Sequence, residues 1–231
     1  MKQGKLIRRA VSAALAGCMM FTLSAPALAA SNDALLQQST AAKSAVSVLD
    51  EENDEDVQDF GIIEVGAEYT TPTRVTSKNY QDILGNGVLS YDPATQTLKS
   101  NGRIKRSSLK INAPDKDINL DGKDKIAVAA KLIVEKAHNV TISSNKYAAI
   151  FARNDTSTID CTGKVDIRSG GDMVVNGNLS INNLGDVDLY ANGNSISNKA
   201  LTITSGGDVT IESTDGRAAA NLTINKADKV T

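Results

Sequence analysis

The stretch 201–211, LTITSGGDVTI, decides the fold, because its apolar spacing recurs along the chain. Each copy reads apolar-x-apolar, five further residues, and apolar-x-apolar again. Clear copies are LSINNLGDVDL (179–189) and LTINKADKVT (222–231), and looser copies occupy 157–167, 132–142 and 109–120. Successive copies start 23, 25, 22, 22 and 21 residues apart. A period of this length is typical of a solenoid, in which each repeat stacks on the next.

Alternation within each short apolar run predicts β-strands with one face inward and one face outward. Strands that recur about every 22 residues can stack in parallel, each rung about 4.8 Å above the last. A third, weaker strand per rung is expected at KIAVAA, DMVVNG and GRAAAN. The sequence therefore predicts an all-β parallel solenoid, with Thr158, Ser180, Thr202 and Thr223 outside and two apolar columns inside. The columns are Ile111, Val134, Ile159, Ile181, Ile203 and Ile224, and Val140, Val165, Val187, Val209 and Val230.

Residues 60–108 precede the repeats and predict an N-terminal β cap. In GVLSYDPATQTLKSNG, the arms VLSY and QTLKS flank DPAT, where Asp92 and Pro93 suit the first positions of a type I turn. The solenoid is then expected over 109–231, where the sequence stops within the second strand of a rung. We expect either a piece of a longer protein or an open edge that binds a partner or a second copy of the chain.

The first 30 residues have the order of a secretory signal peptide. The segment begins with four basic residues, Lys2, Lys5, Arg8 and Arg9. An apolar run over 10–23 follows, and then a stretch of small residues with the expected cleavage after Ala29 or Ala30. An alternative is lipoprotein anchoring at Cys18, the last residue of LAGC. Both predict a secreted or cell-surface protein. Residues 31–59, which contain the acidic run DEENDED, predict a disordered linker.

Charge and cysteine content restrict the partners. Without residues 1–30, 21 basic residues stand against 27 acidic ones, a net charge of −6. Because the repeats offer no basic stripe, and Arg153, Arg168 and Arg217 share no register, we expect neither a basic groove nor nucleic-acid binding. Cys161 is then the single cysteine, so no internal disulfide forms, and a small buried residue is expected there.

The segment DINLDGKD (117–124) resembles the start of a calcium loop, with Asp117, Asn119 and Asp121 as ligands. The twelfth residue of such a loop must be a bidentate Glu, and here it is Val128. Two lysines also lie within the segment. The pattern favours a solenoid rung, with calcium binding as the alternative and no other cofactor expected.

Asp166 and Asp188 occupy the same outward position on successive rungs. Carboxylates about 5 Å apart are typical of retaining glycosidases, so these two are the catalytic candidates if the protein is an enzyme. A surface calcium site and a plain solvated face are the alternatives. Tyr190, next to Asp188, is the expected contact for a bound sugar.

With the hairpin VLSYDPATQTLKSNG followed by rungs of the LTI…GDVTI kind, residues 80–231 resemble secreted repeat proteins of Gram-positive bacteria. The resemblance implies a right-handed parallel β-helix of pectate-lyase-like architecture, a cell-surface location, and contact with polysaccharide or another surface component. It transfers no catalytic residue. We expect a structural, adhesive (adhesin) or carbohydrate-binding module. The alternatives are a polysaccharide lyase or hydrolase and a calcium-stabilised repeat.

Overall fold

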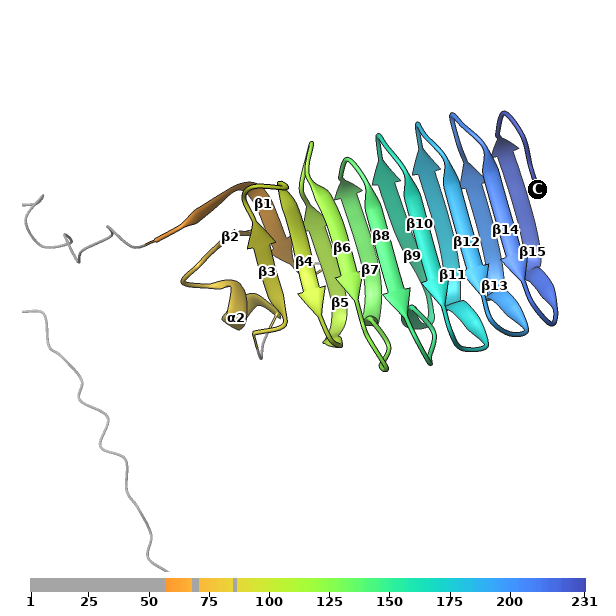
Figure 1. The fold of residues 1–231 in the computed structure, drawn as a ribbon, viewed down its shortest axis with the longest axis horizontal. Coiled ribbons are helices and arrows are strands. Elements are labelled where there is room, and N and C mark those ends of the chain that lie inside the picture. The colour runs from red at the N-terminus through yellow and green to blue at the C-terminus, as the bar shows by residue number, and fades with distance from the viewer. Residues whose placement is uncertain (1–56, 68–70, 85–86) are drawn as a thin grey trace, which may run out of the picture. The chain divides into compact units, whose positions relative to one another are not determined.

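A computed structural model describes residues 57–67, 71–84 and 87–231, which belong to one folded unit (Figure 1). The expected signal peptide, Cys18 and nearly all of the acidic linker lie outside the described residues. Within the described part, strands follow one another in regular succession along a stack of about six turns. The described chain is therefore an all-β solenoid, as its repeats predict.

The described strands form two sheets, and beyond the N-terminal cap successive strands alternate between them. The eight-stranded sheet holds, in spatial order, β15 (Arg217–Lys226), β13 (Ser195–Thr204), β11 (Met173–Asn183), β9 (Ile150–Cys161), β7 (Val128–Lys136), β5 (Ile104–Asn112), β1 (Asp59–Gly66) and β2 (Thr73–Thr76). The seven-stranded sheet holds β14 (Val209–Ser213), β12 (Val187–Ala191), β10 (Val165–Ser169), β8 (Val140–Ser144), β6 (Asp117–Asp121), β4 (Thr97–Asn101) and β3 (Leu89–Asp92). From β4 onward, each strand pairs in parallel with the strand two places later.

The two apolar columns predicted from the repeats form the core. In the eight-stranded sheet, Ile159, Ile181 and Ile203 are register partners on successive turns and are buried. In the seven-stranded sheet, Val165 pairs with Val140 and Val187 and is equally buried. Burying one such side chain stabilises the fold by about 1.5–3 kcal/mol. The exceptions lie in the last turn, where Ile224 is partly buried and Val230 is 53% exposed.

The third strand of each rung differs from expectation, because it is not separate. β11 contains both the expected third strand, which includes Met173, and the following LSINN run. The strand bends between them at Gly177, whose φ of +142° suits a residue without a side chain. A Cβ there would lie 2.7 Å from the Asp155 carbonyl oxygen of the neighbouring turn. Each rung thus consists of one short strand and one long strand.

The N-terminal hairpin is confirmed. β3 and β4 pair antiparallel, and the Asp92 carboxylate accepts a hydrogen bond from the backbone N–H of Ala94 in the turn. β4 also begins the parallel ladder, so the solenoid starts upstream of residue 109. The short helix α2 (Tyr80–Leu84) lies beside this cap, and no helix among the described residues is long and apolar enough to cross a membrane.

Candidate functional site

A bulge in β9 makes one corner of the solenoid irregular. Eight residue steps from Ile150 to Thr158 in β9 face only five from Val128 to Ile133 in β7, so β9 carries three additional residues. The backbone absorbs them through left-handed conformations at Arg153 (φ +51°) and Asn154 (φ +76°). Such conformations are uncommon for residues with a side chain, and they concentrate at functional sites. The bulge in β9 is therefore a candidate for a binding site.

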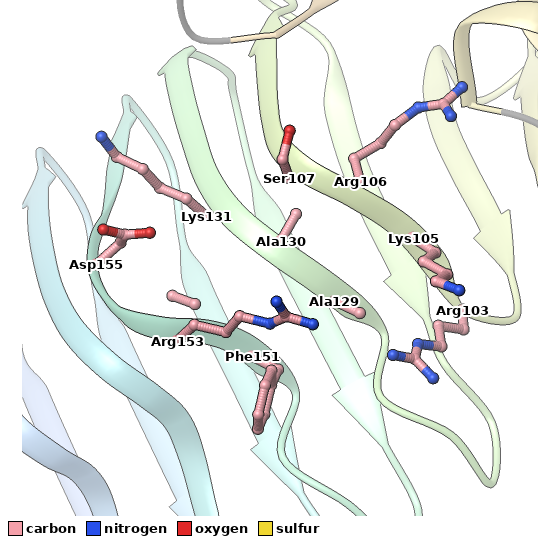
Figure 2. A pocket seen from close by; sticks show the side chains of 11 residues that line it. Arg103, Lys105, Arg106, Ser107, Ala129, Ala130, Lys131, Phe151, Arg153 and Asp155 are labelled. Carbon is pink, nitrogen blue, oxygen red and sulfur yellow. The ribbon is translucent and has the colours of Figure 1, made fainter.

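A hollow of about 490 Å³ lies beside the bulge, on the outer face of β5, β7 and β9 (Figure 2). The floor is made of small residues, among them Ala129 and Ala130. Around them stand five cationic side chains, one carboxylate and one aromatic ring: Arg103, Lys105, Arg106, Lys131, Arg153, Asp155 and Phe151. We call this hollow the basic pocket.

Three of the five cations have their charge free for a ligand. No described carboxylate lies within ion-pair distance of Arg103, Lys105 or Arg153, and all three side chains are exposed. In Figure 2 the side chains of Arg103 and Arg153 extend toward one another beside Ala129. Five cations against the single carboxylate of Asp155 on one concave surface produce a positive potential, which attracts anions.

Arg106 has a structural task instead. Its guanidinium donates hydrogen bonds of 2.7 and 3.0 Å to the carbonyl oxygens of Ile83 and Asp82. Both carbonyls belong to α2, so the side chain points away from the pocket toward the cap (Figure 2). Arg106 therefore joins the cap to the first full turn of the solenoid.

Phe151 supplies the apolar surface of the basic pocket. The residue is half-buried and faces outward, between the inward Ile150 and Ala152. An aromatic ring next to cationic groups offers a flat apolar surface to a ligand whose charged groups are held at the side. The basic pocket thus combines charge recognition with a stacking surface.

The structure brings Asp166 and Asp188 together, as their spacing predicts. They are direct register partners in β10 and β12 on the outer face of the seven-stranded sheet. Each carboxylate, however, has its own cation: Arg168 Nε lies 2.9 Å from Asp166, and Lys164 forms an ion pair with Asp188. The hydrogen bond that Lys164 donates to the Asp188 carboxylate raises the pKa of Lys164. Both carboxylates are therefore ion-paired on the outer face of the seven-stranded sheet, and neither lines the basic pocket.

Tyr190 lies on the same face as Asp188, two positions further along β12. Its register partners are Arg168 on one side and Glu212 on the other. The ring is half-buried between these two charged residues. Tyr190 remains a predicted sugar contact, and it does not line the basic pocket.

The segment that contains Asp117, Asn119 and Asp121 is a rung of the solenoid, as favoured above. It forms β6, with Ile118 and Leu120 buried and the three polar residues facing outward. Alternate residues of a strand are about 6.6 Å apart, so the three side chains do not converge on one point. Among the described residues, no group of three His, Cys, Asp or Glu side chains is arranged for a metal ion. Both carboxylates are already engaged, Asp117 by His138 and Asp121 by Lys123.

Cys161 is buried, as expected from its place in the repeat, and burial raises the pKa of its thiol to about 12. Arg153, Arg168 and Arg217 lie on three different strands and share no register, as expected. Arg153 instead lines the basic pocket together with Arg103 and Lys105, which precede the repeats and were not considered in the sequence analysis. The sequence did contain one signal for the site, the 25-residue spacing that reports the additional residues of β9.

Comparison with known proteins gave no match to a family model, to a curated protein or to a solved structure.

Proposed function

We propose that this protein is a secreted, surface-associated β-solenoid that binds an anionic polysaccharide in the basic pocket. The observation that carries the proposal is the set of three exposed, unpaired cations around the Phe151 ring. Guanidinium and ammonium groups bind carboxylate or sulfate groups of acidic sugars. The apolar face of a sugar ring stacks on an aromatic side chain.

The charge distribution favours a glycan over a nucleic acid. Nucleic acids bind by neutralising many closely spaced phosphates, which requires an extended basic surface. Here three free cations gather in one pocket, and the chain without its first 30 residues has a net charge of −6. An acidic polysaccharide has a lower charge density, so a few cations in one place match it better.

The solenoid suits such a module because it is a rigid scaffold. Every turn is joined to the next by parallel backbone ladders on two sides. Side chains from different turns are thereby held at fixed distances, which lowers the cost of ordering them when a polymer binds. The expected signal peptide in residues 1–30 supports a place outside the cytoplasm, where such polymers occur.

The test uses the purified full chain in a retention assay on immobilised polygalacturonate, hyaluronan, neutral dextran, polyphosphate and single-stranded oligo(dT). We expect retention on the two acidic polysaccharides, and its loss as salt rises. The triple variant Arg103→Gln, Lys105→Gln, Arg153→Gln should lose that retention. The matched control, Lys164→Gln with Arg168→Gln, removes cations from the ion-paired face and should bind as the wild type does.

Each remaining outcome contradicts the proposal. Equal retention of the triple variant places binding elsewhere. Equal binding to polyphosphate or oligo(dT) shows that a sugar ring is not required. Release of polysaccharide fragments instead supports the alternative of a lyase or hydrolase, and Asp166→Asn with Asp188→Asn then shows whether these carboxylates are catalytic.

A further inference from the structure

A second hollow of about 440 Å³ lies on the other side of Phe151. It is formed at the corner where the turns after β8, β10 and β12 meet the outer faces of β9 and β11. Its polar and aromatic lining includes Tyr147, Asp172, Asn176 and Asn192, and Phe151 lines both hollows. We call it the amide pocket.

The chemistry of the amide pocket differs from that of the basic pocket. The side chains of Asn176, Asn192 and Asp172 make no hydrogen bond to another described residue, so their donors and acceptors face the solvent. Tyr147 is 53% exposed, which is unusual for a large aromatic residue. Amide groups beside an exposed ring suit the hydroxyl groups and the apolar face of a neutral sugar.

Charge in the amide pocket disfavours an acidic sugar. The cation that lines it, Lys146, already forms an ion pair of 2.8 Å with Asp124. The carboxylate of Asp172 has no cationic partner among the described residues and repels a second negative charge. The two hollows therefore select for opposite properties, an anionic group in one and a neutral, hydroxyl-rich group in the other.

The register of the strands aligns the two hollows along the solenoid. Phe151 in β9 is the direct partner of Asn176 in β11, and Val128, next to Ala129 in the basic pocket, pairs with Ile150, next to Phe151. Successive partners are about 4.8 Å apart along the stack. A linear polymer laid along the outer face would thus cross from the basic pocket over Phe151 into the amide pocket.

We propose that the amide pocket is a neutral-sugar subsite, so that the ligand is a linear polysaccharide in which neutral sugars adjoin acidic ones. This inference rests on the proposed function of the basic pocket and specifies its ligand. Phe151 then stacks on the sugar at the junction, where the charged and neutral parts of the polymer meet.

Calorimetric titration of the full chain tests the inference with two probes. One is a hyaluronan oligosaccharide, in which uronate and N-acetylglucosamine alternate, and the other is an oligogalacturonate of matched length, in which every sugar is acidic. The variant Tyr147→Ala, Asn192→Ala removes the exposed ring and one amide of the amide pocket. The matched control Leu184→Ala, Asn194→Ala removes an exposed apolar side chain and an exposed amide outside both hollows.

We expect the amide-pocket variant to bind hyaluronan about tenfold more weakly, with an unchanged affinity for oligogalacturonate and an unchanged melting temperature. The control should bind both probes as the wild type does. Equal losses for both probes, or no loss for hyaluronan, overturn the inference while the basic pocket stands. A loss of hyaluronan affinity in the control shows that the effect is not specific to the amide pocket and overturns the inference too. If the wild type binds neither probe, the proposed function fails, and the inference fails with it.

Discussion

Phe151 of β9 and Asn176 of β11 are register partners on adjacent turns, so the ring at the edge of the basic pocket adjoins a side chain of the amide pocket. The β9 bulge begins directly after this pair, and from there Asn176 to Asn178 faces Phe151 to Thr156. The regular ladder thus ends where the two hollows meet. Arg153 and Asp155 project from the irregular segment that follows.

Arg153→Gly separates stability from binding. The left-handed conformation at Arg153 costs about 1–2 kcal/mol for a residue with a side chain, and glycine removes most of that cost. Glycine also loses about 0.5–1 kcal/mol more conformational entropy on folding. We expect a free energy of unfolding equal to that of the wild type or up to about 1 kcal/mol higher in urea denaturation. Affinity for an acidic polysaccharide should fall.

Arg168→Gly is the control for this change, because Arg168 lies within β10 and outside the basic pocket. Glycine in a strand interior should lower the free energy of unfolding by about 1 kcal/mol and leave polysaccharide binding unchanged. If Arg153→Gly destabilises the protein as much as this control does, the bulge is not strained.

Asn183→Ala should be among the most destabilising polar substitutions. The side chain is buried, and its amide nitrogen donates 2.8 Å hydrogen bonds to the carbonyl oxygens of Gly185 and Asp186. Its oxygen accepts hydrogen bonds from the Gly185 N–H and the Cys161 thiol. Removing it leaves these turn groups unsatisfied, so we expect a loss of about 3 kcal/mol in urea denaturation.

The neighbouring Asn182 provides the comparison. It is exposed, and its amide makes a single 3.4 Å contact with Asp160. Asn182→Ala should change the free energy of unfolding by less than about 0.5 kcal/mol. Similar losses for both alanine variants would show that the turn does not depend on the buried amide.

Acid should weaken the hairpin through Asp92. A hydrogen bond from Lys99, at 2.7 Å, is the main cause that lowers the pKa of Asp92 from 3.8 to about 2. Because the folded pKa lies below the unfolded one, the carboxylate contributes stability above pH 3.8, and this contribution is lost as the pH falls toward 2. Urea midpoints measured across this range should fall less steeply in Asp92→Asn than in the wild type. Identical slopes would assign the acid sensitivity to other groups.

Calcium should leave the stability unchanged. The outward side chains of Asp117, Asn119 and Asp121 are spread along β6, and the two carboxylates already accept hydrogen bonds from neighbouring turns. We expect the same melting temperature with a chelator and with about millimolar calcium, a concentration that saturates even weak extracellular sites. A rise of several degrees that Asp121→Asn abolishes would establish the calcium-stabilised alternative.

The sequence determined the solenoid because the pattern that produces this fold is local and recurs along the chain. Apolar-x-apolar runs place Ile159, Ile181 and Ile203 inward whatever the rest of the chain does, and the common spacing stacks them. The same reasoning placed Asp166 beside Asp188 and the turn at Asp92. These features depend on alternation and on turn chemistry, both of which can be read from neighbouring residues.

The binding surface was decided by the tertiary structure. The 25-residue spacing indicated additional residues, but not that they would be absorbed at Arg153 and Asn154. That choice depends on the neighbouring turns, since the ladders of β9 with β7 and with β11 both shift register in this segment. Arg103, next to β5, and Arg153, in β9, reach one hollow from opposite sides of β7. They are far apart in the sequence, but neighbouring strands of the sheet are only about 4.8 Å apart in space. Periodicity fixes which residues face outward, and stacking fixes which of them meet.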